Sequence, residues 1–126
     1  MRTNYASSSL WEAAVGYSRA VRIGNLIEVA GTTASDGDGN IYGKTVYEQA
    51  MYIFDKQQKA LEELGASMQD VIRTRMYVTN IETWDEAGKA HAEFFKDIKP
   101  VATLVEVKGL VSPELLIEIE LTAYID

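Results

Sequence analysis

Apolar side chains occupy every second position along the segment 115–125, near the end of the chain. Leucine, isoleucine and alanine occupy the odd-numbered positions, whereas the even-numbered positions include Glu118, Glu120 and Thr122. Because successive side chains of a β-strand point to opposite faces of the sheet, this pattern predicts a strand with one buried face. Such a strand requires a sheet that other elements cover on one side, so it constrains the fold more than any other segment.

Four other segments have strand composition, and two have the periodicity of amphipathic helices. The predicted strands cover residues 18–23, 26–34, 70–79 and about 102–109. The predicted helices begin at the capping boxes Thr45–Glu48 and Thr83–Glu86, and end near Gly65 and at Lys99–Pro100. Residues 1–17 are predicted to form an arm or an edge strand.

The buried faces follow from the same periodicities. In the strand 70–79, Ile72, Thr74, Met76 and Val78 are assigned to one face, and Val71 to the other. Trp84 and His91 fall on the apolar stripe of the second helix, so both are predicted to pack in the core. Gly31, inside a predicted strand, indicates a bulge or a close approach of another group to the backbone.

The predicted order of elements, β-β-α-β-α-β-β, is typical of an α+β fold. No linker divides the chain, so residues 1–126 are predicted to form a single domain with two helices packed on one face of a mixed sheet. The other face would carry Tyr77 and Tyr124 beside Arg75 and Glu120. This mixture is too apolar for solvent and too charged for a core, so we expect a subunit interface there.

Composition excludes several functions. The chain has 126 residues, a net charge of -7, no cysteine and one histidine, His91. It therefore has no disulfide, thiolate metal site or thiol nucleophile, and its acidic surface opposes binding to nucleic acid. No apolar run approaches the roughly 18 residues of a membrane span, and no signal peptide is visible. We expect a cytoplasmic protein without metal or cofactor, in which the acidic loop 35–40 is a turn.

The stretch Lys99–Leu110 resembles a signature of the RidA/YjgF family, the reactive-intermediate (enamine/imine) deaminases, also named endoribonuclease L-PSP-like. The family pattern is K-P-x-R-S-x-V-E-V, and this chain has K-P-V-A-T-L-V-E-V. Other segments match in the same order and spacing: Gly16–Val21, Gly24–Leu26, Val29–Gly31, Ala60–Ser67, Asp70–Thr74, Val78–Asn80, Ala92–Phe95 and Ile117–Glu120. The resemblance extends from about Gly16 to Ile125.

The resemblance implies a chorismate-mutase-like YjgF fold and a homotrimer with small-molecule clefts between its subunits. It implies hydrolysis of a reactive imine or enamine, with release of ammonia. Glu120 matches the family glutamate that is thought to position or activate the attacking water. Tyr17 matches a tyrosine at the mouth of the cleft, and Gly31 matches a glycine whose backbone meets the ligand.

Three departures from the family pattern fall at this site. Ala102 replaces the arginine that clamps the substrate carboxylate, Ala30 replaces a serine, and Gly88 replaces an asparagine. Thr103 stands at the family serine position and retains a hydroxyl. Glu106 shares a strand face with Ala102. These departures predict a wider and more apolar pocket, and a substrate other than the usual small 2-imino acid.

Several candidate residues have two interpretations. Glu120 is either a general base with a pKa raised by burial or an interface carboxylate in an ion pair. Arg73 and Arg75 either replace the missing cation or are surface charges or partners of Glu118 and Glu120, and Lys108 is a further candidate for the missing cation. Glu106 lines the cleft or forms an ion pair at the strand edge, and Tyr17 contacts a ligand or a neighbouring subunit. His91 is predicted to be a packed, hydrogen-bonded ring rather than a catalytic group.

Two functions remain open at this point. The first is an imine or enamine deaminase in which the carboxylate clamp is lost or replaced. The second is a trimer of the same fold that binds a small metabolite without turning it over. Ribonuclease activity is disfavoured, because RNA cleavage requires proton-transfer groups beside cations that bind phosphate, and this chain is acidic.

Overall fold

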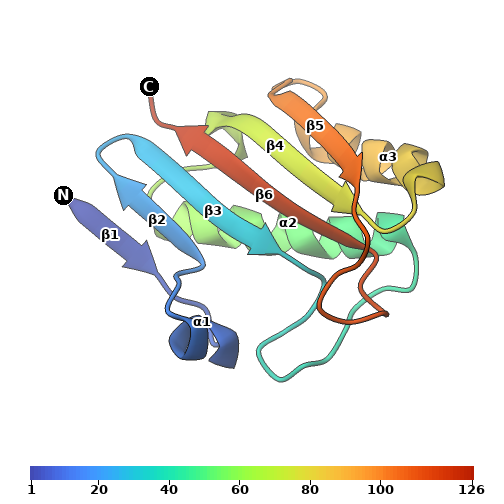
Figure 1. The fold of residues 1–126 in the computed structure, drawn as a ribbon. Coiled ribbons are helices and arrows are strands. Elements are labelled where there is room, and N and C mark those ends of the chain that lie inside the picture. Colours follow the sequence, from blue (N-terminus) through green and yellow to red (C-terminus); the bar gives the residue numbers. More distant parts are fainter.

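The computed structural model describes residues 1–126. It is an α+β domain with a six-stranded mixed sheet, and its strand order is β1-β2-β3-β6-β4-β5. Helices α2 and α3 lie behind the sheet in Figure 1, and no helix covers the front face. The predicted arrangement of two helices on one face of a mixed sheet is therefore confirmed.

The strands have the following bounds: β1 Arg2–Tyr5, β2 Ala20–Ile23, β3 Leu26–Thr32, β4 Val71–Val78, β5 Val101–Glu106 and β6 Ile117–Tyr124. Strand β6 lies between β3 and β4 and is antiparallel to both, whereas β4 and β5 are parallel. The alternation of β6 is confirmed, because its odd-numbered residues are buried and its even-numbered residues are partly or fully exposed.

Helix α2 spans Val46–Glu63 and begins where the sequence predicts. The Thr45 hydroxyl accepts a hydrogen bond from Glu48 N at 3.1 Å. The Glu48 side chain accepts one from Lys44 N rather than from Thr45 N, so the capping box is displaced by one residue. The helix ends before Gly65, which has a φ of 84° and allows Ala66 N to bond to Leu61 O.

Helix α3 spans Trp84–Phe95 and begins after Thr83, as predicted, but without the predicted capping box. Thr83 makes no side-chain cap; its hydroxyl donates to Asn80 O and belongs to the short 3-10 helix η2, Ile81–Thr83. Trp84 is 62% exposed, so its assignment to the core is wrong. Trp84 is the first residue of the helix, and the apolar stripe becomes buried only from Ala87 onward.

The core lies between the sheet and the two helices. Phe54 and Phe95 pack edge to face, at a centroid distance of 5.4 Å, against the buried side of β6. The assignment of Val71 and Ile72 is reversed, since Val71 is buried and Ile72 is 50% exposed. The cause is a shift in the β4–β6 register between Val71 and Arg73, which changes the face that each residue presents.

The N-terminal segment contains more structure than the sequence indicates. Strand β1 forms the edge of the sheet beside β2, as one of the two interpretations predicts. A short helix, α1, then spans Leu10–Val15. No helix of the structure is long and apolar enough to cross a membrane.

Candidate functional site

A cavity of about 540 Å³ lies at one end of the sheet. Figure 1 shows how α1, the loop after β3 and the loop before β6 gather there, below the point where β3 ends and β6 begins. Serines from the segment after β1, side chains of α1 and one lysine of α2 complete its lining. The cavity therefore depends on segments that are far apart in the sequence.

Arg19 connects the elements on one side of this cavity through hydrogen bonds and an ion pair. Its side chain is almost fully buried, with Nε 3.4 Å from a carboxylate oxygen of Glu12 on α1. Its Nη1 donates to Gly31 O at 2.9 Å and to Thr32 Oγ1 at 3.2 Å. Its Nη2 donates to the Tyr17 hydroxyl at 3.3 Å. Arg19 thus fastens α1 and Tyr17 to β3.

Glu118 lies in the cavity without a partner. No hydrogen bond or ion pair within the chain involves its carboxylate. Burial raises the pKa of Glu118, the nearby charge of Arg19 lowers it, and that of Glu120 raises it further. The carboxylate lies directly over Gly31, where any Cβ would overlap a Glu118 oxygen. Gly31 also lies within a shift of the β3–β6 register, so both parts of its prediction are confirmed.

Glu120, two residues further along β6, has a different environment. The Tyr77 hydroxyl donates to Glu120 Oε1 at 2.6 Å, and Arg75 Nη1 lies 3.5 Å from Oε2. The hydrogen bond to Glu120 raises the pKa of Tyr77. Arg75 is therefore a partner of Glu120 within the chain, as the structural interpretation of this arginine predicts.

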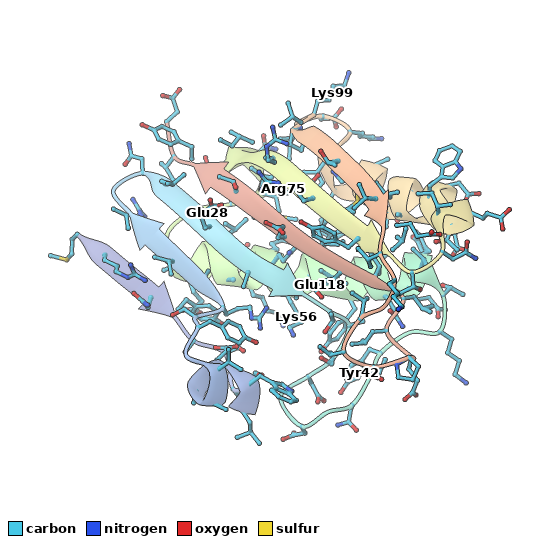
Figure 2. All side chains as sticks on the ribbon, in the orientation of Figure 1. Glu28, Tyr42, Lys56, Arg75, Lys99 and Glu118 are labelled. Carbon is cyan, nitrogen blue, oxygen red and sulfur yellow. The ribbon has the colours of Figure 1, made fainter.

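Lys56 brings a second cation to the cavity. It extends from α2, and its Nζ donates to Ser35 O at 2.8 Å. Burial, followed by the charge of Arg19, lowers the pKa of Lys56. In Figure 2 the labelled side chains of Glu118 and Lys56 lie at the same end of the sheet. No ion pair joins them, although both line the cavity.

The structure brings only some of the predicted site residues together. Tyr17, Ala30, Gly31 and Glu120 line a depression of about 520 Å³ on the uncovered face, next to the cavity. Tyr17 and Gly31 line the cavity as well.

The remaining predicted residues lie elsewhere, on the edge strand β5 and on helix α3. Ala102, Thr103 and Glu106 are on β5, which β6 and β4 separate from β3, and Gly88 is exposed on α3. Three strand spacings correspond to about 14 Å. The two groups therefore do not meet within one chain.

Other candidates either contact groups of the chain itself or lie at its surface. A Glu106 oxygen accepts a hydrogen bond from Ile81 N at 2.9 Å. The His91 ring forms a 2.9 Å hydrogen bond with Thr74 and packs 4.7 Å from the ring of Phe95, so its predicted packing is confirmed. Burial lowers the pKa of His91. Lys108 lies beyond the end of β5 and is exposed.

Sequence reasoning missed Glu118, Arg19 and Lys56 as residues of one cavity. Arg19 lies in the segment Gly16–Val21 that resembles the family, but nothing in this motif indicates that the arginine is buried. The helical periodicity does not mark Lys56 as a site residue, because it lies at the boundary between the buried and exposed sides of α2. No group of three or more histidine, cysteine, aspartate or glutamate residues lies close enough to hold a metal ion.

Comparison with known proteins defines the family. Residues 7–125 match the model of the family described as Endoribonuclease L-PSP. An uncharacterized protein of Streptomyces coelicolor is 40% identical over 94% of this chain and 88% of its own length. A RutC family protein of Pyrococcus abyssi is 34% identical over 86% of this chain and 85% of its own.

Solved structures agree. Rv2704 of Mycobacterium tuberculosis, described as a member of the YjgF/YER057c/UK114 family, is 47% identical with a TM-score of 0.92. The match covers 99% of this chain and 100% of that one. Yeast Mmf1, at 22% identity and a TM-score of 0.87 over 98% of both chains, shares the fold. The chain belongs to the Endoribonuclease L-PSP family, which is the RidA/YjgF family that its motifs resemble.

Proposed function

We propose that this protein is a cytoplasmic homotrimer that hydrolyses the C=N bond of a reactive imine or enamine, with Glu118 as the general base. The observation that carries the proposal is the Glu118 carboxylate, which is half-buried, has no partner and lies against the Gly31 backbone. A carboxyl group with a raised pKa is suited to both accept and return a proton. Glu120, which the family motif suggests for this role, is occupied by Tyr77 and Arg75.

The reaction needs only water and the substrate. Glu118 takes a proton from water as the water oxygen bonds to the imine carbon. It returns this proton to the nitrogen, which gives a carbinolamine. Glu118 then takes the proton of the carbinolamine hydroxyl and delivers it to the amino nitrogen, so that the C–N bond breaks, ammonia leaves and the carbonyl forms. Water enters and ammonia leaves, and no oxidant or cofactor is consumed.

The trimer is proposed from the distribution of the site residues. Gly31 and Glu118 lie on the central strands β3 and β6, with Tyr17 in the same cavity, whereas Ala102 is on the edge strand β5 and Gly88 is on helix α3. These two groups meet only if strand β5 of one copy packs against the central strands of another copy. The uncovered sheet face, with exposed Leu26, Val105 and Tyr124, offers the apolar surface for such packing.

The second candidate is a trimer that binds a metabolite without chemistry. It is favoured by Ala102, Ala30 and Gly88, which replace three polar residues of the family pattern. Ribonuclease activity, despite the family name, is opposed by the net charge of -7 and by the packed environment of His91.

A competition assay separates these candidates. An amino-acid oxidase generates 2-imino acids in place, semicarbazide traps them, and deaminase activity lowers the yield of semicarbazone. We expect the wild type to lower that yield and Glu118→Gln to have no effect, while light scattering gives three times the mass of the chain for both. A wild type that leaves the yield unchanged, over small, branched and aromatic precursors, would contradict the enzyme and favour the binding trimer.

A further inference from the structure

Four charged side chains line the cavity, and two of them already make several hydrogen bonds or ion pairs within the chain. Arg19 bonds to Glu12, Gly31, Thr32 and Tyr17. Asp36 accepts hydrogen bonds from Asn40, Tyr42 and the Asp38 backbone, which lower its pKa to about 2. Only Lys56 and Glu118 retain hydrogen-bonding groups that are available to a ligand.

Lys56 has two unused donors. An ammonium group has three N–H donors, and the chain satisfies one of them, at Ser35 O. The amine is also partly removed from water, and a charge in that position is costly unless an anion or further acceptors compensate it. Lys56 therefore provides a site for an anionic group inside the cavity.

The rim beside this cation is apolar. Trp11 is 68% exposed and Val111 is 88% exposed, and both line the cavity together with Val15. Tyr52 adds an aromatic ring 5.8 Å from Lys56 Nζ. The volume of about 540 Å³ lies within the range of pockets that enclose metabolite-sized ligands.

We infer that the cavity selects ligands that combine a carboxylate with an aromatic or branched apolar side chain. The carboxylate binds Lys56 Nζ, and the apolar side chain covers Trp11 and Val111. Binding of the carboxylate at Lys56 does not depend on catalysis. The placement of a C=N group beside Glu118 does depend on the proposed function. Lys56 on α2 then supplies the cation that is missing at Ala102 on β5.

A binding titration tests this assignment without turnover. The Trp84→Phe variant leaves Trp11 as the only tryptophan, so quenching of its fluorescence reports occupancy of the cavity. We expect 3-phenylpropanoate to quench it, and to bind more tightly than either its uncharged amide or acetate. Lys56→Gln should weaken binding of the carboxylate about tenfold or more, while Lys56→Arg keeps it within a few-fold. Lys59→Gln, an exposed lysine on the same helix, should bind as the parent does.

The inference is overturned if the carboxylate does not quench Trp11, if the amide binds as tightly, or if Lys56→Gln and Lys59→Gln bind equally. The result is separate from that of the deaminase assay. Binding that depends on Lys56 in a protein without deaminase activity would uphold this inference and reject the enzyme. Deaminase activity that depends on Glu118 but not on Lys56 would do the reverse.

Discussion

Polar side chains on the helix-covered side of the sheet have hydrogen-bond partners within the chain, whereas two charged side chains in the cavity at the end of the sheet have one or none. Under the helices, Gln49 is fully buried and bonds to Gly43 O, Glu114 O and Leu116 N. In the cavity, Glu118 has no partner and Lys56 has one. Buried polar groups with partners stabilise a fold, whereas unpartnered groups in a concave site cost stability and remain available to a ligand. The comparison separates the residues that build the domain from those that give it a function.

The strongest test of the covered side is a pair of glutamine variants. Gln49→Leu leaves a backbone N–H and a carbonyl of the loop before β6 without partners, so we expect a loss of about 3 kcal/mol in the free energy of unfolding. Gln57→Leu removes one bond, to Ile119 O, together with an oxygen that has no partner, so the loss should be about 1 kcal/mol or less. Urea unfolding at one protein concentration measures both. Equal losses would show that the hydrogen bonds of Gln49 do not hold this loop.

The pH dependence of stability should differ in sign between the two regions. The pKa of His91 is lowered from 6.5 by burial, so its contribution is present above pH 6.5 and is lost as the pH falls through the folded-state pKa. The pKa of Glu118 is raised from 4.5, so its contribution is present below pH 4.5 and is lost as the pH rises through the folded-state pKa.

Two variants measure these contributions. Glu118→Gln should be more stable than the wild type at neutral pH, and His91→Gln should lose less stability between neutral and acidic pH. Thermal unfolding of the wild type and both variants across this range provides the measurement. A Glu118→Gln protein that is less stable at neutral pH would mean that the carboxylate has a partner in the assembled protein.

The smallest effect concerns Gly88 on the exposed side of α3. A Cβ built there meets no atom within 4 Å. Because glycine is a poor helix former, Gly88→Ala should stabilise the protein by about 0.5–1 kcal/mol. The same urea titration detects this gain. A loss of stability would instead indicate that another copy packs closely over this residue, which would sharpen the location of the interface.

Local patterns predicted the fold well where one residue type determines the backbone. Thr45 and Gly65 bound helix α2, Gly24 and Asn25 form the turn between β2 and β3, and the alternation of β6 gives its buried face. The errors arose where one residue is inserted into a strand and where an apolar stripe extends to the first residue of a helix. The irregular register of β4 exchanged Val71 and Ile72, and Trp84, at the first residue of α3, lies at the surface.

The candidate site was harder to predict, because its chemistry depends on distances between elements. Glu118 and Glu120 share a strand face and a residue type, so periodicity treats them alike. Arg75 and Tyr77 on β4 lie opposite Glu120 and Glu118 in the register, and their side chains pair with Glu120. The closeness of Glu118 to Gly31 depends on the irregular β3–β6 register. Neither relation can be read from one strand alone.

The most direct test of the central claim is a comparison of Glu118→Gln and Glu120→Gln in the imine-hydrolysis assay, with unfolding monitored in parallel. We predict that Glu118→Gln lowers kcat by about 100-fold or more, as expected for the loss of a general base, and leaves the protein folded. Glu120→Gln should retain most of the activity and lose some stability, because it weakens the contacts with Tyr77 and Arg75. The reverse result, with activity lost only in Glu120→Gln, would contradict the assignment of Glu118.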